Sequence, residues 1–215
     1  MVTWAEWFKA AQTRGIDLRS VLDIDVQRDL DALYSSGLPV YDRIFVDGDS
    51  LHSKIEYIQV FSSRHPLMWA RVISKNDPGE RYFRLGLKTI SDLTDFLDQV
   101  LPRSVDQYSL QLFEFVENKM SGNILSSPDR SIVEMIYGIQ IPLARGLVTP
   151  FHAQTNQLGR LVFESQDTPV DIRTAANKAV RYVRCSRGEY QPGYYEFVVG
   201  QEGRVIFVGM NTKIR

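Results

Sequence analysis

The stretch at residues 109–151, SLQLFEFVENKMSGNILSSPDRSIVEMIYGIQIPLARGLVTPF, constrains the fold more than any other part of the chain. Three strand-like runs begin around it, at residues 108–117, 123–127 and 131–137, and the loop GIQIPLARGLVTP follows them. The first run shows the two-residue alternation of a strand, and the turn Pro128-Asp129-Arg130 joins the other two runs into a hairpin. Consecutive strands joined by short turns predict an antiparallel sheet.

The rest of the chain adds both helical and strand-like patterns. Pro102 follows a predicted helix and opens a short connector, at residues 102–107, which is the best candidate for a boundary between lobes. We therefore expect an α+β fold with two lobes, residues 1–107 and 108–215, each with a mostly antiparallel sheet and flanking helices. The further predicted strands are residues 39–46, 54–63, 69–74, 82–87, 148–152, 160–164, 194–199 and 204–208, and the predicted helices are residues 3–14, 25–36, 91–100 and 171–187.

Composition limits the classes of protein and partner. With 44% hydrophobic and 24% charged residues, the 215-residue chain is typical of a globular protein that buries a sizeable core. A net charge of −1 argues against nucleic acid as the partner. No apolar run approaches the roughly 20 residues of a membrane span, and the N-terminus does not have the pattern of a signal peptide. One cysteine, Cys185, forms no internal disulfide, so we expect a cytoplasmic protein.

Common catalytic and metal motifs are missing from the sequence. His52, His65 and His152 are far apart and have no metal-ligand spacing, and there is no GxSxG, Walker A or GxGxxG motif. The predicted first-lobe sheet is unusually basic, and we expect two or three of its cations to face an anionic ligand. These basic residues are Arg64, Arg71, Lys75, Arg81, Arg84 and Lys88.

Several segments together carry a resemblance to a known family. LFEFVENKMSGNILS reads as a strand leading into the pair Ser121-Gly122, SIVEMIYG as an acidic strand, and IPLARGLVTP as a loop. With the closing PGYYEFVVGQEGRVIFVGMNTK, these segments resemble the nucleotide-binding domain of phosphoenolpyruvate synthase, pyruvate phosphate dikinase and rifampin phosphotransferase, a branch of the ATP-grasp fold. In the first half, SGLPVYDRIFVDGDS and YIQVFSSR are similar to the entry segment and to the Val-Arg-Ser-Ser strand of that family.

The resemblance implies an ATP-grasp-like protein that binds a nucleotide or a similar anionic ligand between two lobes, with ATP and Mg²⁺ as cofactors. It implies that Arg64, Lys75 and Arg145 hold phosphates, and that the backbone of Glu114, Phe115 and Val116 meets the adenine edge. The metal ligands that it implies are Glu134, Glu196 and Asn211.

Three positions depart from the family pattern. Gly209 stands at or beside the position of a metal-binding Gln, Asn211 stands where the family has an Arg, and Phe61 replaces the Arg of the Val-Arg-Ser-Ser strand. Phosphoryl transfer depends on cations that neutralise the developing charge, so these losses count against turnover. Two alternatives therefore stay open: a non-catalytic protein that binds a partner protein or a regulatory ligand, and a protein in which Glu134 and Glu196 are ordinary strand carboxylates paired with arginines.

Overall fold

The computed structural model describes residues 32–48, 54–77, 80–100, 105–144, 146–185 and 188–212. Contacts between residues divide the chain into two compact units, each with its own hydrophobic core. We call Tyr41–Val116 the central unit, and Met1–Val40 together with Glu117–Arg215 the flanking unit.

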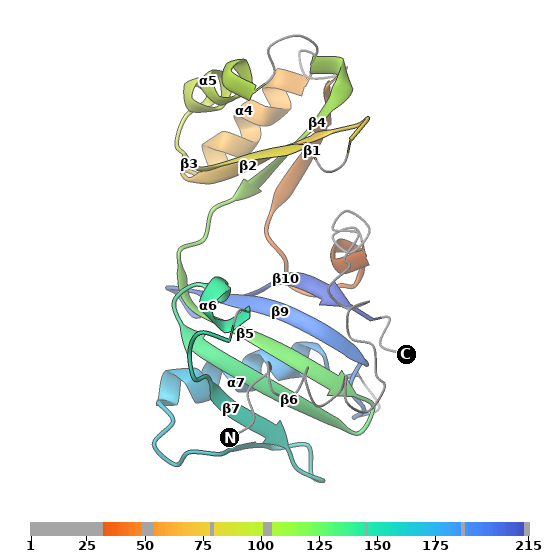
Figure 1. Cartoon of the computed structure of the whole chain (residues 1–215), viewed down its shortest axis with the longest axis vertical. Coiled ribbons are helices and arrows are strands. Elements are labelled where there is room, and N and C mark those ends of the chain that lie inside the picture. Colours follow the sequence, from red (N-terminus) through yellow and green to blue (C-terminus); the bar gives the residue numbers. More distant parts are fainter. Residues whose placement is uncertain are drawn as a thin grey trace. The chain divides into compact units, whose positions relative to one another are not determined.

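The central unit is a four-stranded antiparallel sheet with two helices (Figure 1). Its strand order is β1-β4-β2-β3. Alternate residues of β2 are buried, as the period of two in a strand requires, so one face of the sheet supplies the core. Its elements are β1 (Arg43–Asp47), α4 (Ile55–Arg64), β2 (Met68–Ser74), β3 (Arg81–Leu87), α5 (Ile90–Val100), the 3-10 helix η3 (Val105–Gln107) and β4 (Tyr108–Glu114).

Both helices of the central unit cover the same face of its sheet. Ile58 and Phe61 of α4 share a core with Leu93 of α5 and with Ala70 and Val72 of β2. The residues between those of β2 point to the opposite face, which we call the open face. It carries Trp69, Arg71, Phe83, Leu85 and Phe113, which the strand register places side by side.

The flanking unit is a six-stranded antiparallel sheet with the order β10-β9-β5-β6-β7-β8. Helix α7 packs on one face through a stripe of small and branched residues spaced for a helix, and Ile172 and Ala176 of this stripe are fully buried. Its elements are β5 (Asn118–Ser127), β6 (Arg130–Tyr137), α6 (Gln140–Ala144), β7 (Phe151–Thr155), β8 (Leu161–Phe163), α7 (Val170–Tyr182), β9 (Gly193–Gly200) and β10 (Val205–Asn211).

The α+β class, the mostly antiparallel sheets and the flanking helices are confirmed. The hairpin predicted across residues 128–130 is present as β5 and β6, and the closing hairpin is present as β9 and β10. Helix α7 ends at Tyr182, earlier than predicted. The predicted helix at residues 3–14 lies outside the described residues, as does most of the one at residues 25–36, of which residues 32–35 are helical.

The strand predicted at residues 54–63 is wrong, because this segment forms helix α4. Only Ile58 and Phe61 are buried in it, and these two residues are three apart, which is the spacing of one helix face. The segment YIQVFSSR is therefore not the strand that its similarity to the resembled family predicts.

The predicted boundary between residues 107 and 108 also differs from the structure. Strand β4 begins at Tyr108 and pairs with both β1 and β2, so it belongs to the central unit. The reason is that Leu110 and Leu112 of β4 complete the core of that unit. The chain passes between the units after Val40 and again after Val116.

Candidate functional site

A row of polar side chains crosses the sheet of the flanking unit. Glu134 of β6 pairs with Asn123 of β5, which pairs in turn with Glu196 of β9. Directly paired residues of an antiparallel sheet point to the same face. Their neighbours along the strands, among them Ile124 and Phe197, belong to the core under α7. The polar row therefore lies on the face away from α7.

The polar row is buried at Glu134 and Asn123 and half-buried at Glu196. Glu134 and Asn123 are each 2% exposed. The amide nitrogen of Gln140, in α6, donates to Asn123 Oδ1, and the Tyr194 hydroxyl donates to Glu196 Oε1 at 3.1 Å. Burial raises the pKa of Glu196, and the hydrogen bond from Tyr194 opposes that shift. Burial also raises the pKa of Tyr194 strongly, and the charges of the two glutamates add to the shift.

Asn211 approaches the same row from the edge strand β10. It pairs with Tyr194, and Gly209 pairs with Glu196, so all four residues share one face of the sheet. A Cβ atom on Gly209 would lie 2.8 Å from Glu196 Oε2, which places the Glu196 carboxylate directly over the glycine. Gly209 thus leaves room for the carboxylate beside the buried Asn211.

The predicted metal ligands are only partly brought together. Glu196 and Asn211 lie on neighbouring strands, whereas Glu134 is separated from Glu196 by Asn123 on β5. Among the described residues, no group of three or more His, Cys, Asp or Glu side chains converges as a metal site. Mg²⁺ is commonly held by one or two protein oxygens together with substrate phosphates and water. Glu196 with Asn211 fits that pattern, and the role of Glu134 as a ligand stays a prediction.

The segment Glu114–Val116, which we call the hinge segment, connects β4 to the flanking unit. The Phe115 N–H donates to the Leu67 carbonyl at 2.9 Å, and the Glu114 N–H donates to the Asp42 carbonyl at 3.0 Å. In the described part of the chain, the Phe115 carbonyl and the Val116 N–H take part in no hydrogen bond. The hinge segment therefore has an acceptor and a donor left over.

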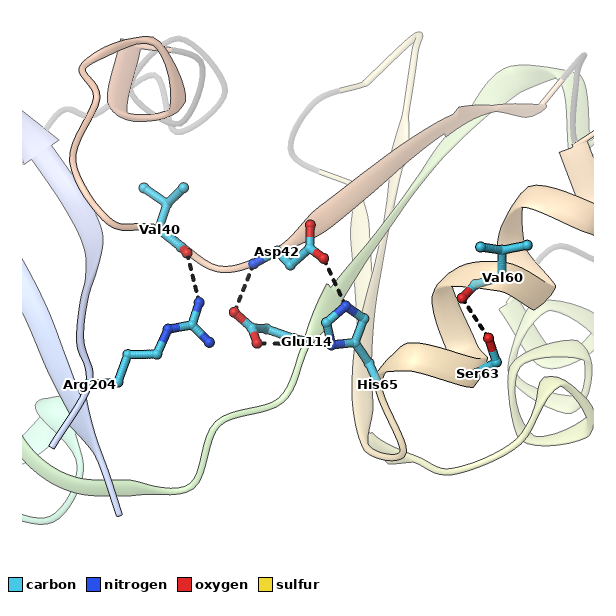
Figure 2. A network of polar contacts seen from close by, with 7 residues as sticks. All are labelled: Val40, Asp42, Val60, Ser63, His65, Glu114 and Arg204. Carbon is cyan, nitrogen blue, oxygen red and sulfur yellow. Dashed lines mark hydrogen bonds and ion pairs between the residues drawn. The ribbon is translucent and has the colours of Figure 1, made fainter. Parts of the chain in front are cut away.

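Side chains fix the start of the hinge segment. The Asp42 N–H donates to Glu114 Oε1 at 2.8 Å, and His65 Nε2 lies 2.8 Å from Asp42 Oδ2 (Figure 2). His65 Nδ1 faces Glu114 Oε2 at 3.9 Å, and the His65 ring packs on Phe61 with 4.5 Å between ring centroids. Sequence reasoning missed Asp42 and His65, since three segments far apart in the chain meet here.

The predicted phosphate-binding residues have different surroundings. Arg64 is exposed at the C-terminal end of α4, and Lys75 forms an ion pair with Asp47 at 2.5 Å. Both belong to the central unit, whereas Glu134, Glu196 and Asn211 belong to the flanking unit. Arg145 lies outside the described residues.

Arg71 stands out among the basic residues of the central unit. It is half-buried on the open face, and its Nε is a buried donor with no acceptor within the described residues. Burial lowers the pKa of Arg71, and the neighbouring charge of Arg81 lowers it further. The signal for this residue is in the sequence MWARVIS, where Arg71 is the one charge in an otherwise apolar strand.

Aromatic residues lie between the hinge segment and Arg71. Trp69 and Phe113 stack with ring centroids 3.9 Å apart and an interplanar angle of 7°. Trp69 is two residues from Arg71 on β2, and Phe113 immediately precedes Glu114 on β4. The open face thus runs from the hinge segment over an aromatic pair to a half-buried cation.

Comparison with known proteins gives no family. No family model matches the sequence, and no curated protein matches it. None of the helices in the described part of the chain is long and apolar enough to cross a membrane.

Solved structures match with low sequence identity. D-alanyl-alanine synthetase A from Vibrio cholerae is 10% identical over 83% of this chain and 52% of that chain, with a TM-score of 0.43. A RiPP-associated ATP-grasp ligase from Chryseobacterium gregarium, in complex with ADP and a leader and core peptide, is 14% identical over 93% and 53%, with a TM-score of 0.42. The biotin carboxylase subunit of pyruvate carboxylase is 17% identical over 89% and 40%, with a TM-score of 0.43. The chain spans about half the length of the first of these structures, and TM-scores below 0.5 do not establish a shared fold.

Proposed function

We propose that this protein is ATP-grasp-like and binds a purine nucleotide, with the base at the hinge segment. The observation that carries the proposal is the carbonyl of Phe115 and the N–H of Val116, which have no partner in the described part of the chain. Both groups belong to the trans peptide that joins Phe115 to Val116, so they point in opposite directions and a base edge would meet one of them. An adenine amino group would donate to the Phe115 carbonyl, and a backbone group of this kind orients a ligand in a mostly apolar site.

The open face suits the rest of a nucleotide. Arg71 pairs with Gln111, three residues before Glu114 on β4. At about 3.4 Å per residue, the hinge segment and Arg71 are roughly 10 Å apart along the sheet, which a nucleoside phosphate can span. Trp69 lies between them, stacked on the fully buried Phe113, and provides aromatic surface for the base. A phosphate would give the buried Nε of Arg71 the acceptor that it lacks within the described residues.

Two of the residues that the resemblance implies as metal ligands fit a divalent cation. Glu196 and Asn211 would hold Mg²⁺ through a carboxylate and an amide oxygen. A cation at this position would also favour the ionised form of Glu196, which burial disfavours. The roles of Arg64, Lys75, Arg145 and Glu134 stay predictions.

Binding without turnover is the second candidate function. The observation in its favour is Gly209, whose lack of a side chain removes a ligand from the position beside Glu196. The open face also carries Phe83 and Leu85, which are 70% and 58% exposed and suit an apolar partner. Such a protein would keep the nucleotide as a regulatory ligand or bind a partner protein in its place.

Thermal unfolding of the full chain, with and without ATP and Mg²⁺, tests the proposal. A ligand at a hundred times its Kd stabilises the folded state by about 2.7 kcal/mol, which raises Tm by several degrees. No change at millimolar ATP would contradict nucleotide binding. A rise in Tm that requires Mg²⁺ favours a phosphotransferase or ligase, and a rise that is independent of Mg²⁺ favours binding without chemistry.

A further inference from the structure

Strand β3 is an edge strand of the central sheet, with β2 as its neighbour (Figure 1). The Ser74 N–H donates to the Glu80 carbonyl at 3.0 Å, which makes these two residues a hydrogen-bonded pair at the start of the β2–β3 ladder. Hydrogen-bonded pairs alternate along an antiparallel ladder, so the backbone groups of Arg81, Phe83 and Leu85 point away from β2. The described residues supply no hydrogen-bond partner for these outward groups.

The side chains on this edge are unprotected as well. Phe83 and Leu85, on the open face, are 70% and 58% exposed. Sheets commonly protect an edge with proline, with inward-pointing charges or with a covering element. The sequence RYFRL of residues 81–85 contains no proline, and the ladder is regular until a bulge at Gly86, which has a φ of +77°. An edge of this kind can add a further strand.

A second copy of β3 fits this edge in one antiparallel register. When Phe83 lies opposite Phe83 of the second copy, Arg81 lies opposite Leu85, and every outward residue of both copies belongs to a hydrogen-bonded pair. A shift by two residues leaves an outward residue of each copy without an outward residue opposite it. The register also keeps like charges from facing each other directly, because neither Arg81 nor Arg84 is opposite an arginine.

Charges on the helix-covered side of β3 complement this register. Tyr82 lies opposite Arg84 of the second copy, and Glu80 precedes Tyr82 by two residues on the same face. Glu80 Oε1 accepts from the Tyr82 and Tyr108 hydroxyls at 3.0 and 3.1 Å, which fixes the carboxylate at the edge. Arg84 is exposed and has no ion-pair partner within the described residues. Diagonal neighbours on one face lie about 7–8 Å apart, so Arg84 of each copy can reach Glu80 of the other.

We infer that two copies of this chain associate through β3, with a two-fold axis at Phe83 that joins the two four-stranded sheets into one. A two-fold axis is the usual symmetry of a homodimer, and it makes each contact occur twice. One pair of strands buries little surface, so the association is weak and depends on protein concentration. The pairing requires no nucleotide and is independent of the proposed function.

Sedimentation equilibrium of the full chain over a series of concentrations tests the inference. The average mass of the wild-type chain should rise from 24.7 kDa towards twice that value. Phe83→Glu should weaken the association by about tenfold or more, because it replaces an aromatic pair at the axis with two like charges. Phe45→Glu is the matched control, since Phe45 is 47% exposed on the open face of β1, at the opposite edge of the sheet. This variant should associate as the wild type does.

Cysteine cross-linking tests the register, in a Cys185→Ser background because Cys185 is exposed. The Cα atoms of a hydrogen-bonded pair are about 5.5 Å apart, which suits a disulfide, so Phe83→Cys should give a linked dimer on oxidation with copper phenanthroline. Arg81→Cys should not, because the two substituted residues are roughly 13 Å apart along the strands. A wild-type chain that stays monomeric at all concentrations would overturn the inference. Equal weakening by Phe45→Glu, or linkage through Arg81→Cys but not Phe83→Cys, would overturn it too.

Discussion

The carboxylate of Glu196 lies over the backbone of Gly209, so that a Cβ atom on Gly209 would be 2.8 Å from Glu196 Oε2. The two residues are paired neighbours on β9 and β10, and Tyr194 holds the other carboxylate oxygen. The position of this carboxylate therefore depends on the absence of a side chain at residue 209. The first three predictions concern Glu196.

Gly209→Ala is expected to lower the free energy of unfolding by about 1–3 kcal/mol, the usual cost of overpacking a tight site. Urea denaturation of the single variant and of the double variant Gly209→Ala/Glu196→Ala measures it. Truncation of Glu196 removes the group that the new methyl meets, so the alanine at 209 should cost less in the double variant. Equal costs in both backgrounds would contradict the contact.

Glu196→Gln is expected to stabilise the folded chain at neutral pH. Burial raises the pKa of Glu196 above 4.5, the ordinary value for a glutamate, so the folded state binds the proton more tightly than the unfolded state does. The charged carboxylate therefore destabilises the fold above its folded pKa, and this cost fades as the pH falls towards 4.5. The difference in unfolding free energy between the variant and the wild type should shrink over that window. A difference that is constant with pH would show that ionisation of Glu196 is not its source.

Mg²⁺ is expected to raise the Tm of the wild-type chain in the presence of ATP, and to raise it less in Glu196→Gln. The reason is that an amide is a weaker ligand for a hard cation than a carboxylate is. Glu202→Gln is the control, because Glu202 is exposed in the turn between β9 and β10. Equal Mg²⁺ effects in the two variants would remove Glu196 from the proposed metal site.

Arg71→Ala is expected to weaken ATP binding by about tenfold or more, the cost of losing a charge-assisted hydrogen bond to phosphate. Arg84→Ala is the control on the neighbouring strand, because Arg84 is exposed and pairs with Ala70, whose side chain lies on the helix-covered face. Calorimetric titration compares the two variants. If Arg84→Ala reduces the affinity as much as Arg71→Ala, the effect is one of general charge and the open face does not hold the phosphate.

Phe61→Ala is expected to cost the central unit about 3–5 kcal/mol, because the ring is fully buried in its core. Val60→Ala, at an exposed neighbouring position on α4, should change stability by no more than about 0.5 kcal/mol. Hydrogen exchange of the β2 and β4 amides reports on this unit. Ile58→Ala should also be costly, because the helix buries residues 58 and 61 on one face, whereas a strand would place them on opposite faces.

Much of the fold could be predicted from local patterns. The stripe of Ile172, Ala176 and Ala179 repeats at the period of a helix, and the β5–β6 hairpin has a turn sequence between two apolar strands. The strand prediction for residues 54–63 was wrong because the branched and aromatic side chains of this segment are compatible with two patterns. They alternate as in a strand, and they also have the spacing of one helix face. Only the core decides between the two, by burying Ile58 and Phe61.

The candidate site was less predictable because its contacts are not local. The sequence pointed to Glu134 and Glu196 but not to Asn123 between them, since the order of strands in a sheet is not visible in a local pattern. The contact between Asp42 and Glu114 joins residues 72 positions apart. Arg71 was one of six basic candidates until its burial in β2 set it apart.

The reciprocal hydrogen bonds between Asp42 and Glu114 bring the two ends of the central unit together. A segment of 76 residues, Tyr41–Val116, therefore starts and finishes at nearly one point. A module with adjacent ends can be placed in a surface loop of another protein at a small entropic cost, because the host chain barely has to open. In evolutionary terms, the central unit has the geometry of an insertable domain, which recombination can transfer as one piece.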